Sequence, residues 1–245
     1  MPGDPYSLPQ PTRGFSEELS RSPGRLRIGL CRVNELSPLH PDCVAAVDSV
    51  ARCLAAEGHY VEEAYPENQF DESGYAGYFR IIAVGTVATV RAIERIAGRS
   101  LTEADMEPGS WVSYQMGLPV TGAEYAEAHA HMNLFTRRYA AWWEGGNGYD
   151  LLLSPTMATP PPKLGFLISE PADRVIRSRD TFPFTMQCNV TGQPAISLPL
   201  AMSRDGLPVG VQLAARYGDE AMLLRIAAQL EQLMPWHQRK PTGIE

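Results

Sequence analysis

The chain has 245 residues, of which 44% are hydrophobic and 20% are charged, and its formal net charge is −7 at pH 7. This composition excludes an intrinsically disordered chain and indicates a globular protein. The acidic balance and the scattered arginines argue against nucleic acid as a partner, because binding to phosphates needs a clustered basic surface. The opening residues lack the pattern of a secretory signal, and no apolar run approaches the roughly 20 residues that a membrane helix needs. We therefore expect a cytoplasmic protein without a membrane partner.

The cysteines and histidines do not predict a metal site. The four cysteines are Cys31, Cys43, Cys53 and Cys188. They form no CxxC pair, and such scattered thiols are typical of a reduced, cytoplasmic protein. His129 and His131 fall within a predicted helix, where residues two apart point away from each other. We expect neither a metal nor a cofactor.

The first part of the chain predicts a lead-in followed by an α/β crossover. Residues 1–25 are rich in Pro, Gly and Ser and predict an extended lead-in, and residues 26–245 predict one domain. Leu26–Arg32 has the apolar, β-prone character of a buried strand, and Pro41–Glu57 has apolar residues at helical spacing. His59–Glu62 resumes strand character. This strand–helix–strand order favours parallel pairing.

Two longer helices and a short strand are predicted in the middle of the chain. Ser73–Ala97 and Gly122–Glu144 both carry apolar residues at three- and four-residue spacing. The glycine-rich stretch Gly145–Gly148 is expected to end the second helix. Tyr149–Leu153 is a short apolar run bounded by turn residues, which predicts a buried strand.

The stretch Thr181–Ala215 predicts a buried loop followed by two strands. The strands are expected at Ala195–Leu200 and Val209–Ala214, and Arg204–Pro208 supplies the turn between them. Asp219 is a suitable N-cap for a final helix.

The same stretch resembles the C-terminal signature of the amidase-signature amidases. Phe184–Pro199 is similar to the family's "FT…N.TG.PA.S.P" element, and Gly206–Leu213 is similar to its "GLPVGVQ" turn and strand. Asp150–Thr156 resembles the family's strand ending in "PT", and Asp4–Ser7 resembles its "DPxS" link. The resemblance covers nearly the whole chain and extends to bacterial enzymes of the 6-aminohexanoate cyclic-dimer hydrolase type. It implies the C-terminal portion of an α/β amidase fold, with an incomplete mixed central sheet flanked by helices.

The resemblance also exposes missing catalytic residues. Amidases of this family hydrolyse the C–N bond of linear carboxamides with a Ser nucleophile, a second Ser in a cis peptide and a Lys base, and glycine-rich backbone N–H groups stabilise the oxyanion. The chain has no "GGSSGGS" motif, and its only lysines, Lys163 and Lys240, do not match the family's base. The resemblance therefore assigns no catalytic residue here, and we expect the chain to be inactive alone.

What the resemblance does assign is one wall of a substrate pocket. In the family, the loop after the "PT" strand and the "FT…N" loop face the acyl side of the substrate. The corresponding residues are Thr156, Met157, Phe184, Thr185, Met186, Cys188 and Asn189. The alternative is that these side chains only pack their loops. The implied partners are an amide substrate, once a catalytic half is supplied, and a second chain at the open edge of the sheet, because unpaired strand edges favour association.

Three functional hypotheses remain open on the sequence. The first is a portion of an amidase that supplies part of the substrate pocket. The second is a non-catalytic binding or scaffolding protein derived from the same fold. The third is an independent α/β enzyme that uses Cys188 or Ser197 as its nucleophile.

Overall fold

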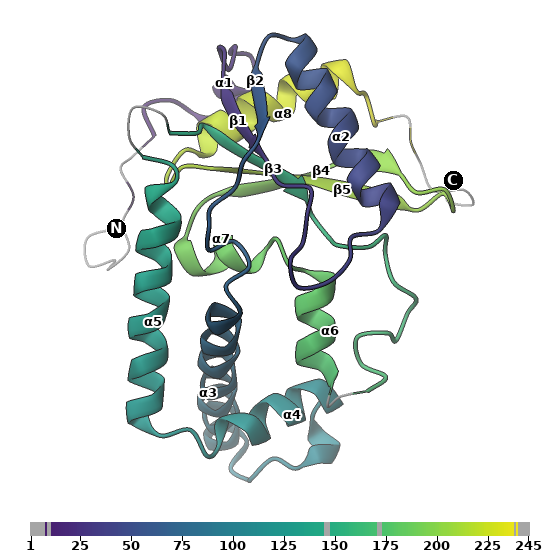
Figure 1. The fold of residues 1–245 in the computed structure, drawn as a ribbon. Coiled ribbons are helices and arrows are strands. Elements are labelled where there is room, and N and C mark those ends of the chain that lie inside the picture. Colours follow the sequence, from purple (N-terminus) through teal and green to yellow (C-terminus); the bar gives the residue numbers. More distant parts are fainter. Residues whose placement is uncertain (1–7, 9–10, 145–147, 171–172, 238, 240–245) are drawn as a thin grey trace.

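A five-stranded mixed sheet forms the centre of the molecule (Figure 1). The computed structural model describes residues 8, 11–144, 148–170, 173–237 and 239. The strands are β1 (Arg27–Leu30), β2 (Tyr60–Glu63), β3 (Leu151–Pro155), β4 (Ala195–Met202) and β5 (Pro208–Ala215). Their order across the sheet is β2-β1-β3-β5-β4. Strands β2, β1 and β3 are parallel, whereas β5 runs antiparallel to both β3 and β4.

Helices flank this sheet. They are α1 (Phe15–Glu18), α2 (Pro41–Ala56), α3 (Glu72–Ala97), α4 (Pro108–Gly117), α5 (Gly122–Ala141), α6 (Arg174–Thr181), α7 (Met186–Thr191) and α8 (Glu220–Leu233), with a short 3-10 turn at Glu103–Asp105. Side chains cap several of their starts: Asp71 accepts from the N–H of Ser73 at α3, and Asp219 accepts from the N–H of Met222 at α8. The predicted α/β fold with a mixed central sheet is confirmed.

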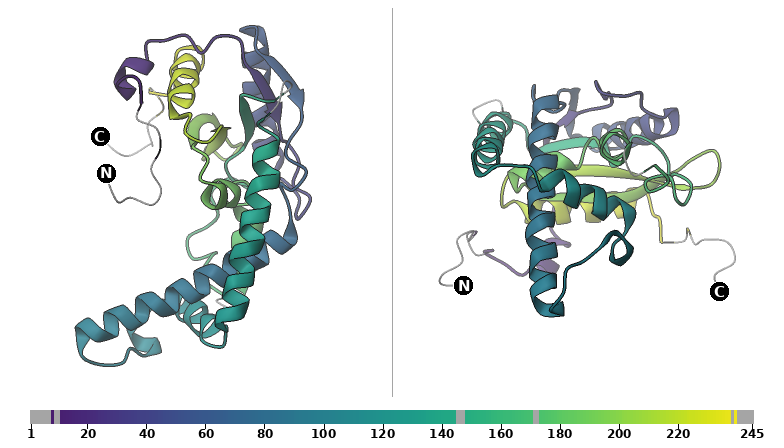
Figure 2. Two further views of the ribbon diagram at one scale, coloured as in Figure 1. Left: turned by 90° about the vertical axis from the view of Figure 1, so that its left-hand side faces the viewer. Right: turned by 90° about the horizontal axis from the view of Figure 1, so that it is seen from below.

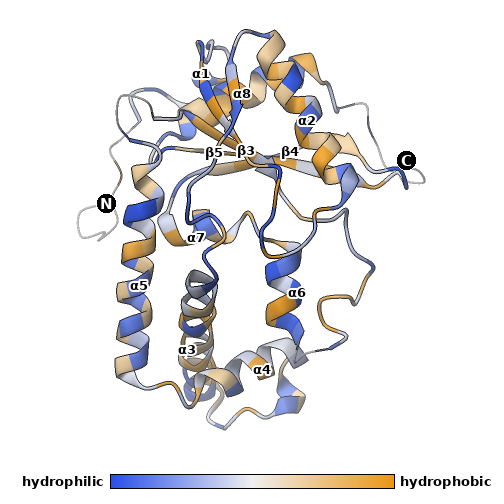
Figure 3. Cartoon of the chain, in the orientation of Figure 1, coloured by the Kyte–Doolittle hydropathy of each residue, from blue (hydrophilic) through white to orange (hydrophobic). Residues whose placement is uncertain are grey.

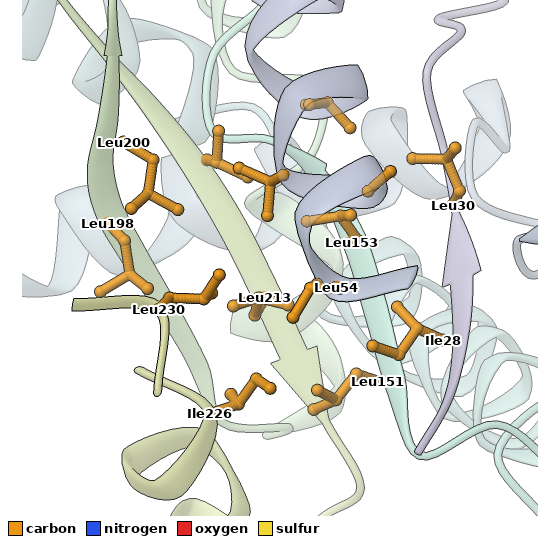
Figure 4. Close-up of a cluster of buried hydrophobic side chains, with 14 of the residues drawn as sticks. Ile28, Leu30, Leu54, Leu151, Leu153, Leu198, Leu200, Leu213, Ile226 and Leu230 are labelled. Atoms are coloured by element: carbon orange, nitrogen blue, oxygen red, sulfur yellow. The ribbon is translucent and has the colours of Figure 1, made fainter. Parts of the chain in front are cut away.

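One face of the sheet packs against α2 and α8 (Figure 4). Leu151 and Leu153 of β3 point to this face, where they meet Leu54 of α2, and Leu213 of β5 meets Ile226 of α8 within the same cluster. In Figure 3 the hydrophobic colours gather in the strands and along α2, whereas α6 is mostly hydrophilic. Successive side chains along each strand point to opposite faces of the sheet, so every second residue of β3 and β5 faces α2 and α8.

The other face packs against α7, α5 and the start of α3. Leu152, between the two leucines that face α2, joins a second cluster with Phe135, Phe184 and Met186. Within this cluster the rings of Phe70 and Phe184 meet edge to face at 5.8 Å, whereas those of Phe135 and Tyr139 are stacked. The chain therefore has two cores, one on each side of β3.

The predicted parallel pairing and the predicted turn are confirmed. Strand β1 pairs in parallel with β2, as the strand–helix–strand order predicts. Strands β4 and β5 lie on either side of the predicted turn and pair antiparallel, with a register shift between Leu198 and Ala201. The predicted N-cap at Asp219 is also confirmed.

Several local predictions are wrong or lie outside the described residues. The lead-in is not wholly extended, because α1 forms one helical turn in it. The helices α4 and α6 were not predicted, and α7 occupies what was predicted as loop. Helix α5 ends at Ala141, and residues 145–147 lie outside the described part, as do the "DPxS" residues and Lys240.

Tertiary bonds explain the unpredicted helix α7. The buried Gln187 amide donates to the carbonyl of Pro183 at 2.9 Å and to that of Gln69. Gly192, with φ of 74°, ends the helix in the left-handed region. The bond to Gln69 spans 118 positions and is not visible in six residues of sequence.

Helix α3 is unusual in being long, apolar and largely uncovered. It has 26 residues and is, among the described helices, the one long and apolar enough by length and composition to cross a membrane, but only 22% of its apolar window is buried. No segment of membrane length was expected from the sequence because Arg80 and Arg91 interrupt the apolar run, but the helix as a whole is long and apolar enough by length and composition. Figure 2 shows the outer part of α3 projecting with α4 away from the sheet.

The close contact between α3 and α4 predicts that a larger residue at Gly117 destabilises the fold. A Cβ added at Gly117 of α4 would lie 2.3 Å from the carbonyl oxygen of Ala83, whereas one added at Gly122 meets nothing within 4 Å. We expect Gly117→Ala to lower the free energy of unfolding by about 1–3 kcal/mol, because backbone must move to admit the methyl group. Gly122→Ala is the matched control and should cause no loss. Urea unfolding followed by circular dichroism measures both, and equal stability of the two variants would contradict the contact.

Candidate functional site

The segment that leaves β3 meets β4 and β5 through a pair of hydroxyl groups. Thr156 donates its backbone N–H to the carbonyl of Gly210 at 3.1 Å, and its Oγ1 lies 2.6 Å from Oγ of Ser197. A Cβ on Gly210 would lie 2.7 Å from that serine oxygen, so only glycine admits the pair. Both hydroxyl groups are neutral, and neither is a base for the other.

A first cavity of about 260 Å³ opens beside this hydroxyl pair. It is lined by Thr156, Met157, Thr159, Pro161, Ser197, Pro199, Pro208, Val209 and Gly210. The lining is small and mostly apolar. Thr156 and Met157, two of the residues that the sequence predicted to line the pocket, therefore lie together at this cavity.

A second cavity of about 200 Å³ lies between α3, α6 and α7. Its lining combines aromatic, apolar and polar side chains: Tyr75, Tyr78, Phe79, Ile82, Ser178, Arg179, Phe182, Thr185, Met186 and Asn189. Three sequence-predicted residues, Thr185, Met186 and Asn189, thus share one wall. A larger cleft of about 520 Å³ shares Tyr75, Phe79 and Arg179 with this cavity and continues between α3, α6 and the start of α5.

Backbone and side-chain bonds hold the two regions together. The N–H of Ala158, in the loop that lines the first cavity, donates to the carbonyl of Thr181 at the end of α6. The amide of Gln212 on β5 donates to the carbonyl of Phe184 at 2.8 Å, just before α7. The two loops are therefore fixed to the same sheet, although the two cavities have no lining residue in common.

The two remaining predicted residues belong to the core. Phe184 is buried and lines neither of these cavities. Cys188 packs against the same cluster, and burial raises the pKa of its thiol to about 11. A cysteine nucleophile needs a lowered pKa. The environment of Cys188 therefore opposes the hypothesis that it is a catalytic thiolate.

A buried polar network behind the second cavity was missed by sequence reasoning. Tyr75 donates its hydroxyl to the carbonyl of Pro183 at 2.8 Å, and burial raises the pKa of that hydroxyl to about 12. Gln187 donates to the same carbonyl, while its Oε1 is buried without a hydrogen-bond partner among the described residues. These residues come from segments more than 100 positions apart, so only the fold brings them together.

Charged residues at the mouth of the cleft were also missed. Arg179 lies 2.8 Å from Asp180 and 3.5 Å from Glu72, which is mostly exposed. Arg80 and Glu124 line the same cleft. No sequence signal indicated Arg179 and Asp180, because α6 was not predicted, and the helical spacing around Arg80 and Glu124 does not indicate which exposed charges converge.

Comparison with known proteins shows that the chain belongs to the amidase family. The family model described as Amidase matches residues 1–224. The 6-aminohexanoate-cyclic-dimer hydrolase of Paenarthrobacter ureafaciens is 39% identical over 253 residues, which cover 98% of this chain and 50% of that protein. The putative amidase AmiC of Mycobacterium tuberculosis (strain ATCC 25618 / H37Rv) is 32% identical over 225 residues, covering 86% of this chain and 44% of that protein.

Solved structures support the same family assignment. A structure of 6-aminohexanoate cyclic dimer hydrolase superimposes with a TM-score of 0.92 at 37% identity, over 99% of this chain and 52% of that one. A second structure of that enzyme, complexed with substrate, gives a TM-score of 0.91. The chain spans about half the length of the curated relatives it matches.

The burial of Cys188 predicts that its thiol reacts slowly at neutral pH. Because its thiol pKa is raised from 9.0 to about 11, the thiolate fraction at pH 7 is roughly 100-fold below that of an ordinary cysteine. We expect iodoacetamide to modify Cys188 slowly at neutral pH, with a rate that rises with pH up to about 11. Peptide mass spectrometry measures the rate, and the chain unfolded in guanidinium is the control. If Cys188 were alkylated at pH 7 as fast in the folded as in the unfolded chain, the hypothesis that Cys188 is a nucleophile would be supported.

Proposed function

Because the chain belongs to the amidase family, we propose that it supplies one wall of the substrate pocket of an amidase that hydrolyses carboxamide C–N bonds. The proposal combines the family match with the two cavities beside the ends of β3 and α7. In it, the chain binds and orients the substrate, and the reacting groups come from elsewhere.

The absence of a serine–lysine catalytic set from the 245 residues carries this proposal. The sequence contains no glycine- and serine-rich catalytic motif and only two lysines, of which Lys163 is exposed in the loop after three prolines. Acyl transfer by serine needs a base that removes the hydroxyl proton and donors that stabilise the oxyanion. The hydroxyl pair of Thr156 and Ser197 provides neither. The catalytic groups therefore belong to polypeptide beyond these residues, in a longer protein or in a separate chain.

The cavity between α3 and α7 is our candidate for the acyl side of the pocket. Its polar groups at Thr185 and Asn189 lie among aromatic and apolar side chains, a combination typical of sites that orient a neutral ligand. We assign Thr156 and Met157, in the neighbouring cavity, to the same wall. We infer a neutral or hydrophobic amide as the substrate, and the relatives' name makes the cyclic dimer of 6-aminohexanoate the first compound to test.

A cytoplasmic location is part of the proposal. The cysteines of the chain are free thiols, two of them buried, which suits a reducing compartment. The same cavities without reacting groups also suit a non-catalytic binding protein, which is our second candidate function. The two candidates differ in what happens when catalytic groups are supplied.

Complementation tests the proposal. The purified chain alone should not release amines from 6-aminohexanoate cyclic dimer, because it lacks a base and an activated serine. Co-expression with the half of the Paenarthrobacter ureafaciens hydrolase that this chain does not match should give measurable amine release. The control is the same pair with the nucleophilic serine of the supplied half changed to alanine.

Two outcomes would contradict the proposal. Hydrolysis by the chain alone that disappears in Ser197→Ala or Cys188→Ala would establish an independent enzyme. Binding of the amide by the chain, measured by calorimetry, with no hydrolysis in the complemented pair would favour the binding protein.

A further inference from the structure

Three side chains lie between the proposed acyl cavity and the larger cleft beside it. The acyl cavity, between α3, α6 and α7, encloses about 200 Å³, and the cleft between α3, α6 and the start of α5 encloses about 520 Å³. Tyr75, Phe79 and Arg179 line both spaces, so these three side chains form the partition between them. Both spaces lie beside α3 and α6, below the strands in Figure 1.

The partition limits the size of what the acyl cavity can hold. Pockets that bury a drug-sized ligand enclose about 300–1,000 Å³, and the acyl cavity of about 200 Å³ is below this range. The cavity and the cleft together fall within the range. Whether the partition is closed therefore decides whether a short or a long acyl group fits.

The cleft beyond the partition has a lining that suits a continuing aliphatic chain. Most of its lining residues are apolar, and they come from α3, α4, α6 and the loop before α5: Ala76, Ala83, Met116, Val120, Val175 and Ile176. Burial of methylene groups against such side chains is favourable because it removes apolar surface from water.

Among the three partition residues, Phe79 is the one that no polar bond holds in place. Tyr75 is 4% exposed and donates its hydroxyl to the carbonyl of Pro183 at 2.8 Å. Arg179 forms ion pairs at 2.8 Å and 3.5 Å. Phe79 has no polar side-chain atom, and its ring meets Tyr78 edge to face at 5.5 Å. Truncation of Phe79 therefore opens the partition without breaking a hydrogen bond or an ion pair.

We propose that Phe79 sets the upper size limit of the acyl group, so that the acyl cavity admits short aliphatic acyl groups and no longer ones. This inference rests on the proposed function for the kind of ligand, an amide, and for the assignment of the cavity to its acyl side. The ring of Phe79 closes the cavity toward the cleft. Without the ring, a longer chain continues past Tyr75 into the space beside Ala76.

A series of aliphatic primary amides tests the limit without catalysis. Butanamide, hexanamide, octanamide and decanamide are titrated into the purified chain, and binding is followed by NMR. Each methylene group that becomes buried raises the affinity about three- to fourfold. In the unaltered chain we expect this rise to stop after hexanamide. In Phe79→Ala decanamide should bind at least about tenfold more tightly than hexanamide, since full burial of the added methylenes would give on the order of 100-fold.

A second substitution shows where the longer chain lies. Ala76 lines the cleft but not the acyl cavity, so Ala76→Phe refills the cleft alone. In the Phe79→Ala background it should remove the added affinity for decanamide and leave the affinity for hexanamide unchanged. Circular dichroism checks that each variant is folded. If Phe79→Ala does not fold, Phe79→Leu is the milder truncation and should give a smaller gain for decanamide.

Three results would overturn the inference, and they distinguish it from the proposed function. Affinity that rises steadily from butanamide to decanamide in the unaltered chain would show that the partition sets no limit, and would leave the proposed function intact. A plateau after hexanamide that persists in folded Phe79→Ala would assign the limit to another residue. Binding of no amide by either chain would contradict both, and amine release by the complemented pair tests the proposed function separately.

Discussion

The rest of the structure depends on the complete burial of β3 between β1 and β5. All five residues of this strand are buried, and it joins the parallel half of the sheet to the antiparallel half. Its alternating side chains divide the molecule into two cores, because Leu151 and Leu153 face α2 while Leu152 faces Phe184 and Met186. The candidate site begins where this strand ends, at Thr156. A change that removes β3 from the sheet would therefore disrupt both cores and both cavities.

The two cavities follow from how loops are fixed to this strand and its neighbour. Gln212 of β5 lies opposite Ser154 of β3 and holds the carbonyl of Phe184, which sets the start of α7. Helix α7 in turn presents Thr185 and Asn189 toward α3. Buried amide donors that bond to backbone carbonyls give such loops a defined position, since leaving those groups unpaired costs about 1–3 kcal/mol each. These bonds thus give the loops that line the two cavities a defined position.

Much of this architecture was predictable from sequence, because strands and long helices leave periodic patterns. The parallel pairing of β1 with β2, the turn between β4 and β5, the long helices and the family were predicted correctly. Helix α7 was missed because its stability depends on the bond from Gln187 to the carbonyl of Gln69, which is far away in sequence. Resemblance grouped seven residues as one wall, but the structure places Phe184 and Cys188 in the core and divides the other five between two cavities. Which side chains converge depends on packing across the sheet, which one-dimensional spacing does not contain.

The central claim is that this chain forms the acyl-side wall of an amidase pocket. Asn189 is its most direct probe, because it is exposed and lines the cavity, so its removal should not disturb the core. The measurement is kcat/KM for the cyclic amide by the complemented pair carrying Asn189→Ala, compared with Arg52→Ala, an exposed control on α2. The account predicts at least a roughly tenfold loss for Asn189→Ala, the size expected when a group that orients the substrate is removed, and no loss for Arg52→Ala. Equal kcat/KM for the two variants would contradict it.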